Sequence, residues 1–207
     1  MNGKRLFVNA LTFSRVPLIL VWLALAIVGE FHGNFWWGFW GAVMLSASGF
    51  TDLFDGKLAR KWNVVSTLGK MADPLMDKVF FVVTFPTLAW QAAHQGESDC
   101  HALVLLGFTI LYMLRDLWVT FLRSVGTMYG ADVAAMWLGK VRTALSFPCA
   151  GWVYLYLVWH RLVAAEWDGP WLASCYVFEA TLVLLTVVSI FTYTKSYAAY
   201  LKRALEK

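Results

Sequence analysis

Four aspartates lie between strongly apolar segments in the first half of the chain: Asp52, Asp55, Asp73 and Asp77. On helices, the first two share one face and the last two share another, because residues three or four apart are neighbours. An aspartate near the middle of a membrane helix costs about 2.5–3.5 kcal/mol, so we expect something positive to neutralise the cluster. Converging carboxylate oxygens suit Mg²⁺ or Mn²⁺, and two such ions form a clamp used in phosphoryl transfer.

The aspartates belong to a longer pattern, D-x2-D-G-x2-A-R-x8-G-x3-D-x3-D, which runs from Asp52 to Asp77. All eight fixed residues are present within 26 positions. The pattern resembles the signature of the CDP-alcohol phosphotransferases. That resemblance implies transfer of a phosphatidyl or similar group from a CDP-linked donor to an alcohol, with release of CMP. The alternative, that the aspartates only cap helices, fits Asp73 best because Pro74 follows it.

The resemblance also implies a role for each residue of the pattern. Asp52, Asp55, Asp73 and Asp77 would hold two ions of Mg²⁺ or Mn²⁺, and Asp77 would also act as the general base. The residues that would bind the CDP donor are Asp52, Gly56, Ala59, Arg60 and Gly69. The small residues would leave room for the cytidine, while Arg60 would pair with the pyrophosphate or, alternatively, anchor the helix at the membrane surface.

Two later segments resemble those of bacterial phosphatidylglycerophosphate synthases, which use CDP-diacylglycerol and glycerol 3-phosphate. They are Arg115-Asp116-Leu117 with Leu122-Arg123, and Gly139-Lys140-Val141-Arg142-Thr143. The resemblance implies that four cations bind the acceptor phosphate, namely Arg115, Arg123, Lys140 and Arg142. Each of them could instead be a snorkelling anchor at the membrane interface.

Three residues depart from the synthase segments and concern the acceptor rather than the reaction. Asp116 stands where Glu is usual, Ser124 where a second Glu is common, and Ser146 where Gln is frequent. A cardiolipin synthase or a phosphatidylinositol-phosphate synthase of the same chemistry is therefore an alternative. A divalent-cation transporter is a more distant one, since intramembrane carboxylates also mark ion pathways.

The composition predicts an all-α, polytopic membrane protein that forms a single domain over residues 1–207. The chain is 60% hydrophobic, and its mean hydropathy of +0.61 is too high for a soluble domain of this size. We expect six transmembrane helices, at about 17–29, 35–54, 69–90, 102–123, 137–159 and 171–193. A short amphipathic helix should precede them on the membrane surface, where Asn9 to Arg15 resembles the N-x-L-T-x-x-R segment that opens many family members.

The distribution of charge predicts the orientation. If both termini are cytoplasmic, sixteen of the seventeen Lys and Arg residues lie inside and only Arg161 lies outside. The site would then face the cytoplasm from the inner membrane, and the basic residues would meet lipid and nucleotide phosphates rather than nucleic acid. All four histidines fall at the opposite end, as interfacial or loop residues. Glu179, in the sixth span, would be paired or protonated at a helix interface, either within the chain or at a homodimer contact.

Overall fold

The computed structural model of the chain describes residues 3–96, 99–130, 137–163 and 168–206, and every regular element in these ranges is a helix. The elements are α1 (Gly3–His32), α2 (Phe35–Lys61), α3 (Thr67–Gln95), α4 (Asp99–Met128), α5 (Trp137–Val163) and α6 (Asp168–Leu205). Each of the six predicted spans falls inside one helix. The prediction of an all-α fold is therefore confirmed for the described residues.

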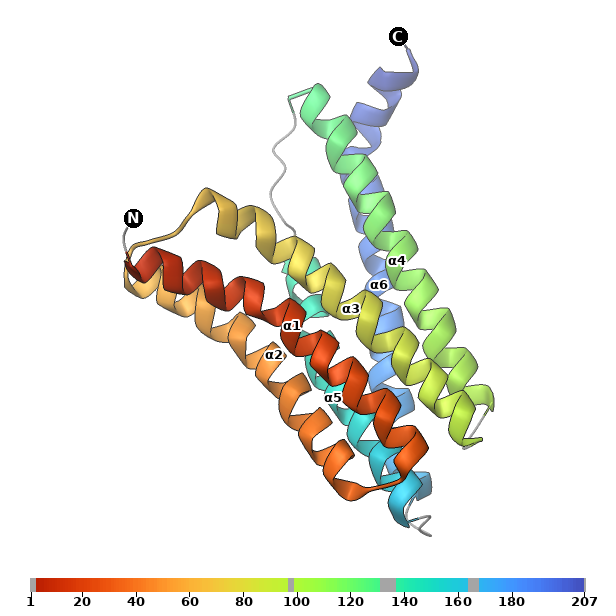
Figure 1. Ribbon diagram of the computed structural model, residues 1–207. Helices are drawn as coiled ribbons and strands as arrows, with labels where there is room; N and C mark the ends of the chain where they lie inside the picture. The colour runs from red at the N-terminus through yellow and green to blue at the C-terminus, as the bar shows by residue number, and fades with distance from the viewer. Residues whose placement is uncertain (1–2, 97–98, 131–136, 164–167, 207) are drawn as a thin grey trace.

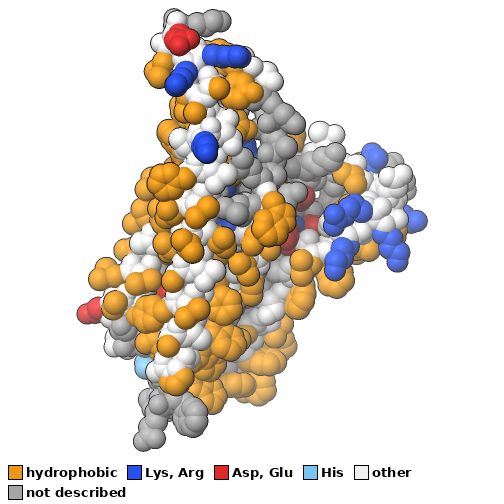
Figure 2. All heavy atoms as spheres, turned by 180° about the vertical axis from the view of Figure 1, so that it is seen from behind, with side chains coloured by type: hydrophobic (Ala, Val, Ile, Leu, Met, Phe, Trp, Pro, Cys, Tyr) orange, Lys and Arg blue, Asp and Glu red, His pale blue; other side chains and the backbone are white. Residues whose placement is uncertain are grey.

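Three of the helices are long and apolar enough to cross a membrane: α1, α4 and the part of α6 that covers Gly169–Leu205. Large hydrophobic side chains also remain exposed on the outside of the other helices, for example Phe39 and Trp40 on α2 and Leu155 on α5. Figure 2 shows such side chains over most of one face of the molecule. Exposed apolar surface of this extent fits lipid and not water, so the chain is a membrane protein.

Successive helices alternate in direction, as Figure 1 shows. The start of α1, the end of α2 and the start of α3 lie at the same end of the molecule as the ends of α4 and α6. There the helices separate into two arms, one made of α1, α2 and the first part of α3, the other of α4 and α6. Lys and Arg side chains gather on both arms (Figure 2). We call this the basic end.

The start of the chain differs from the prediction of a short surface helix followed by a separate span. α1 is one helix with Pro17 inside it. The reason is its buried stripe, which continues at spacings of three and four on both sides of the proline, at Val8, Thr12, Arg15, Ile19, Trp22, Ala26 and Gly29. Packing along this stripe outweighs the one backbone hydrogen bond that a proline removes.

Close packing of α2 against α5 closes the end of the molecule opposite the basic end. A Cβ atom on Gly38 would clash with Val158, and one on Gly41 would clash with the hydroxyl of Tyr154. Only glycine lets the two backbones approach this closely. The Tyr154 ring in turn meets the edge of Trp22 on α1, with ring centroids 5.5 Å apart.

α3 lies at the centre of the bundle and packs against α1, α4 and α5. Its N-cap is Ser66, whose Oγ accepts a hydrogen bond of 2.9 Å from the Gly69 backbone N–H. Asp73 is therefore inside the helix, one and a half turns beyond its first residue, and the interpretation of Asp73 as a helix cap is wrong. Pro74 is tolerated inside this helix.

Two acidic or basic residues far from the aspartates prove to be buried. His101 at the start of α4 lies with its Nε2 atom 2.9 Å from Oε1 of Glu179 on α6, and both side chains are inaccessible to solvent. The prediction that His101 is an interfacial or loop residue is therefore wrong. Glu179 is paired at a helix interface, as one of its two interpretations held, and the interface lies within a single chain.

Candidate active site

The four aspartates come together at the basic end, where α2 and α3 both pack against α1. A fifth residue lies among them, Arg15 from α1, whose side chain is only 2% exposed. Its Nη2 atom is 2.7 Å from Oδ1 of Asp52 and also contacts Oδ2 of Asp55, while Nη1 is 3.3 Å from Oδ1 of Asp77. Arg15 is therefore a positive partner of the cluster within the chain itself.

Residues around Arg15 on α1 also hold the motif in place. Thr12 donates a hydrogen bond of 2.8 Å from Oγ1 to Oδ2 of Asp55, a side chain that is 3% exposed. Asn9 accepts one of 2.8 Å from the capping hydroxyl of Ser66. No role for Asn9, Thr12 or Arg15 is predicted from the sequence. The pattern that could have pointed to them is the N-x-L-T-x-x-R segment, in which they are the fixed polar residues.

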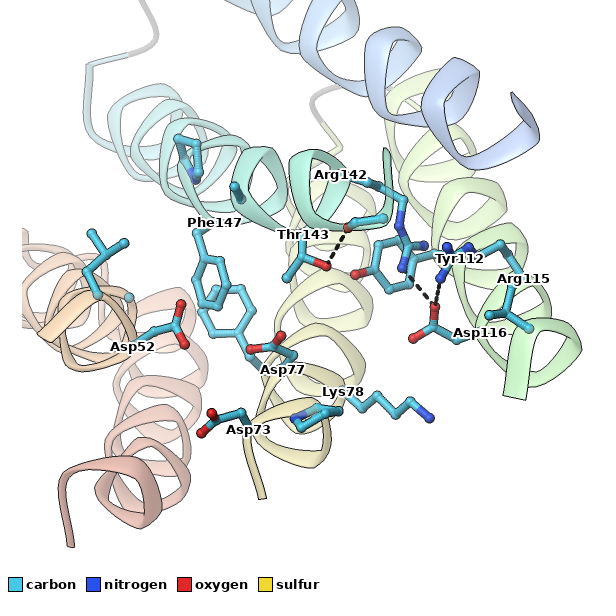
Figure 3. A pocket seen from close by; sticks show the side chains of 18 of the residues that line it. Asp52, Asp73, Asp77, Lys78, Tyr112, Arg115, Asp116, Arg142, Thr143 and Phe147 are labelled. Carbon is cyan, nitrogen blue, oxygen red and sulfur yellow. Dashed lines mark hydrogen bonds and ion pairs between the residues drawn. The ribbon is translucent and has the colours of Figure 1, made fainter. Parts of the chain in front are cut away.

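A cavity of about 860 Å³ opens between the two arms. Asp52, Asp73 and Asp77 line one side of it, while the cations on α4 and α5 line the other side: Arg115, Arg123 and Arg142. Figure 3 shows the three carboxylates turned toward one another, with Arg115 and Arg142 across the cavity. The structure thus brings two groups of opposite charge, which are far apart in the sequence, to one cavity.

Asp116 joins two of these arginines. Its Oδ1 atom accepts hydrogen bonds from Nη1 of Arg115 at 2.9 Å and from Nη2 of Arg142 at 2.7 Å, as the dashed lines in Figure 3 show. From the sequence, Asp116 is only a departure from the usual Glu. In the structure it links α4 to α5 on the cationic side of the cavity.

The three arginines differ in how many of their N–H groups are already bound. Arg115 uses Nη1 on Asp116, and both Nε and Nη2 on Ser189. Arg123 donates from Nη2 to the hydroxyl of Tyr193 at 3.0 Å, and its buried Nε atom has no partner among the described residues. In Arg142, both Nε and Nη1 are buried without a partner in the described part of the chain. Of the three arginines, Arg142 therefore has the most buried donor atoms left to bind an anion.

The other predicted donor-binding residues line a second, smaller pocket of about 260 Å³, together with Asp55 and Asp73. They are Gly56, Ala59, Arg60 and Gly69. A Cβ atom on Gly56 would have only Arg60 within 4 Å, at 3.9 Å, so the glycine faces open space. Asp73 lines both cavities, which makes it the boundary between them.

Two predicted site residues are less well placed by the structure. Arg60 is exposed and donates from Nε to the backbone oxygen of Gly56 at 3.0 Å, so its position is compatible with both of its interpretations. Lys140 belongs to α5, but its side chain lies outside the described residues. The cationic side of the cavity consequently rests on the three arginines.

Comparison with known proteins supports the family suggested by the motif. Residues 5–192 match the model of the family described as CDP-alcohol phosphatidyltransferase. The chain belongs to this family. As a CDP-alcohol phosphatidyltransferase, it is an enzyme of phospholipid biosynthesis.

The relatives of this phosphatidyltransferase carry two kinds of name. A cardiolipin synthase (CMP-forming) of Streptomyces coelicolor is 37% identical over 159 residues, which cover 70% of this chain and 74% of the relative. A CDP-diacylglycerol–glycerol-3-phosphate 3-phosphatidyltransferase of Salmonella paratyphi A is 27% identical over 159 residues, covering 74% and 82%. The protein of that name from Escherichia coli K12 is 28% identical over 134 residues, covering 65% and 68%.

CDP-alcohol phosphatidyltransferases generally depend on divalent metal ions, and the aspartates fit that requirement in the type and number of their oxygens. Their present arrangement is not a closed cage. Among the described residues, no three carboxylate, imidazole or thiol side chains are grouped as a metal site. The guanidinium of Arg15 lies against Asp52, Asp55 and Asp77. A metal ion would therefore have to compete with Arg15 for the same oxygens.

Proposed function

We propose that this phosphatidyltransferase transfers the phosphatidyl group of CDP-diacylglycerol to sn-glycerol 3-phosphate, which releases CMP and gives phosphatidylglycerophosphate. The observation that carries the proposal is the group of three arginines across the cavity from the aspartates. An acceptor that bears a phosphate dianion needs cations of its own, because a phosphate drawn among the metal ligands would compete with the pyrophosphate of the donor. The arginines supply such a place at the far wall of the same cavity.

The donor would lie across the boundary between the two cavities. Gly56, Ala59 and Gly69 leave room for the cytidine in the smaller pocket, while Arg60 at its edge carries positive charge for the pyrophosphate. The larger cavity also has an apolar wall suited to acyl chains, formed by Leu45, Phe50, Leu53, Phe80, Phe147 and Pro148. The head group and the lipid tails of one donor molecule would thus meet different parts of the site.

The aspartates would bind the metal ions and accept the proton of the acceptor hydroxyl. We propose that Asp52, Asp55, Asp73 and Asp77 hold two ions of Mg²⁺ or Mn²⁺, which when bound neutralise charge on the pyrophosphate oxygens. Asp77 lines the larger cavity, where the acceptor enters, and would take the proton of the attacking hydroxyl. Asp55 is buried behind it and accepts a hydrogen bond from Thr12, so its part would be to hold and orient.

Arg142 would be the main ligand of the acceptor phosphate. Its Nε and Nη1 atoms, which have no partner among the described residues, belong to one planar guanidinium and can bind two phosphate oxygens at once. The side chain is fixed by Asp116 on one edge and by the ring of Tyr112, whose centroid lies 3.7 Å from the guanidinium carbon. A preformed guanidinium loses little freedom when it binds the anion.

Cardiolipin synthesis is a second candidate, and the 37% identity to the Streptomyces protein is the observation that favours it. Its acceptor, phosphatidylglycerol, carries a phosphodiester and two acyl chains, so it would need apolar surface beside the arginines as well as charge. The same experiment separates the two functions.

The test is to purify the full-length protein and to measure CMP release from CDP-diacylglycerol with a panel of acceptors. Glycerol 3-phosphate should support the reaction, whereas glycerol, which has no phosphate, should support it at least about 100-fold less well, the discrimination expected when a buried cationic site is left unfilled. Inositol 1-phosphate and phosphatidylglycerol, which do carry a phosphate, should be poorer acceptors than glycerol 3-phosphate because the rest of each molecule differs in size and shape. Preferential use of phosphatidylglycerol would instead assign the protein to cardiolipin synthesis. CMP release with none of these acceptors would refute both assignments.

We further propose that all six helices cross the inner membrane, with both termini in the cytoplasm and with residues 1–207 acting as one domain in a homodimer. The support for this topology is the charge distribution, because Lys and Arg gather at the end of the molecule that holds the aspartates (Figure 2). α2 and α3 supply Asp52, Asp73 and Asp77 to the larger cavity, and α5 supplies Arg142. A bundle interior that binds charged substrates requires such residues.

A further inference from the structure

Arg15 makes closer contact with the aspartates than any role assigned so far explains. Its guanidinium reaches Asp52 and Asp55 on α2 and Asp77 on α3, and it is almost fully buried. It therefore connects three helices through the carboxylates that are proposed to hold metal ions.

The same oxygen atoms cannot serve Arg15 and a divalent ion equally well. The guanidinium occupies Oδ1 of Asp52, Oδ2 of Asp55 and Oδ1 of Asp77. A metal ion would need oxygens of these carboxylates, and its charge would repel a guanidinium at the same place.

We propose that Arg15 is an internal counter-ion, which holds the three carboxylates together in the metal-free protein and competes with divalent cations for them. The inference rests on the metal site of the proposed function. Binding of a metal ion is then an exchange, in which the cation displaces at least one N–H group of Arg15 from the cluster.

Two details favour displacement over permanent binding. The Nε atom of Arg15 is buried without a partner among the described residues, so the guanidinium is not fully satisfied where it lies. In addition, Asp55 keeps the hydrogen bond from Thr12 when Arg15 moves away. The carboxylate that is most deeply buried thus has a second support on the same helix as Arg15.

Without Arg15, the aspartates would repel one another in the metal-free protein, since they share a partly buried site. Neutralising them from within the chain lets the protein fold before it meets a metal ion. Because Arg15 competes for the carboxylates, the affinity of the protein for the metal ion is weaker, and this affinity can be measured in the absence of substrate.

The experiment uses the full-length protein in detergent, without CDP-diacylglycerol. Binding of Mn²⁺ is followed by the electron paramagnetic resonance signal of the free ion, and thermal unfolding is recorded with and without Mn²⁺. Arg15→Gln should bind Mn²⁺ about tenfold more tightly than the wild type, as expected when a competing charge-assisted hydrogen bond is removed. Its metal-free form should unfold at a lower temperature, and Mn²⁺ should raise its melting temperature by more than that of the wild type.

Two variants control for charge and for folding. Lys57→Gln removes a positive charge from an exposed position two residues after Asp55, and should change the Mn²⁺ affinity by about twofold or less. Arg15→Lys keeps the charge without the forked geometry, so its affinity should lie between those of the wild type and Arg15→Gln. This variant carries the test if Arg15→Gln does not fold.

Unchanged or weaker Mn²⁺ binding in both Arg15 variants would overturn the inference, since a competitor cannot be removed without a gain in affinity. Asp52→Asn separates this failure from that of the proposed function. If Asp52→Asn loses Mn²⁺ binding while the Arg15 variants show no gain, the metal site stands and only the role of Arg15 falls. If Asp52→Asn binds Mn²⁺ as well as the wild type, the metal site itself is wrong.

Discussion

Replacement of Arg142 by Gln provides the sharpest test of the acceptor site. Gln is too short to span the cavity and carries no charge, so the variant loses the hydrogen bonds that Nε and Nη1 would donate to a phosphate. One charge-assisted hydrogen bond is worth about 1.5–3 kcal/mol. Since 1.4 kcal/mol corresponds to a factor of ten, the KM for glycerol 3-phosphate should rise roughly ten- to hundredfold. The KM for CDP-diacylglycerol should change little.

The structure also predicts an order among the three arginines. Among the described residues, Arg142 has two buried donor atoms without a partner, Arg123 has one, and every N–H-bearing atom of Arg115 already donates to Ser189 or Asp116. The effect of a change to Gln on the acceptor KM should therefore decrease from Arg142 to Arg123 to Arg115. Arg115→Gln should act mainly on stability, because it removes the hydrogen bonds to Ser189 that help to hold α4 against α6.

Arg161 is a matched control for Arg142. It lies on the same helix, its side chain is only 10% exposed, and it has two unpartnered nitrogen atoms among the described residues. Its Nη1 atom is 3.0 Å from Oε1 of Glu30, which also accepts hydrogen bonds from Gln91 and Gln95. Each arginine thus pairs with a carboxylate that keeps another partner when the arginine is lost. The two changes to Gln should cost similar stability, while only Arg142→Gln should alter the acceptor KM.

The assay is CMP release by the purified variants at varied glycerol 3-phosphate and saturating CDP-diacylglycerol, with melting temperatures measured in parallel. Equal losses of stability in Arg142→Gln and Arg161→Gln, together with an unchanged acceptor KM in both, would show that Arg142 is an anchor. The assignment of glycerol 3-phosphate as acceptor would then lose its support, while membership of the phosphatidyltransferase family would stand.

Three further predictions concern the base, the topology and the packing. Asp77→Asn should still bind CDP-diacylglycerol but lose about 10²–10⁴-fold in the rate of transfer, whereas normal turnover with weakened donor binding would limit Asp77 to binding. Native Cys100, which is exposed at the start of α4, should react with an impermeant thiol reagent in intact cells. Lys61→Cys, made in a Cys100→Ser background, should not react, and the reverse pattern would mean that the topology is inverted. Gly41→Ala should cost about 1–3 kcal/mol of stability because its methyl group would be overpacked against Tyr154, whereas Gly107→Ala, where there is open space, should be neutral or stabilising. Equal effects of the two changes in a thermal unfolding assay would show that α2 and α5 do not pack as described.

Local patterns in the sequence were sufficient to predict the helices and the grouping of the aspartates. Apolar segments of membrane length predicted one helix for each of the six spans, although not that the first would extend back through the surface segment, and spacings of three and four placed each pair of aspartates on one face. The family signature grouped Gly56, Ala59, Arg60 and Gly69 with Asp52 as donor-binding residues, and the first four line the smaller pocket. All of these relations lie within one helix or within a fixed motif, so they are visible without knowledge of the packing.

The partners of the charged residues could not be predicted, because they depend on how distant helices meet. Arg15 is 40 residues from Asp55 and 62 from Asp77, and His101 is 78 residues from Glu179. In addition, arginine is common at the cytoplasmic boundary of a membrane, so the positive-inside rule already accounts for an arginine at position 15. A residue type that is common in a region carries little information about a special role there, and only the geometry distinguishes the two.

The two charged sides of the cavity follow the same physical logic with opposite signs. Arg15 lies among three carboxylates, and Asp116 lies between two arginines. In each group the residue of opposite charge reduces the cost of collecting like charges in surroundings of low polarity. Neither group is neutralised completely, since three carboxylates share one guanidinium and Arg142 keeps unpartnered donors. The residual charge is negative where metal ions would bind and positive where a phosphate would bind. Metal ions would therefore neutralise the remaining negative charge of the aspartates, and a phosphate would neutralise the remaining positive charge of the arginines. The two ligands would stay apart, because the arginines repel metal ions and the aspartates repel a phosphate.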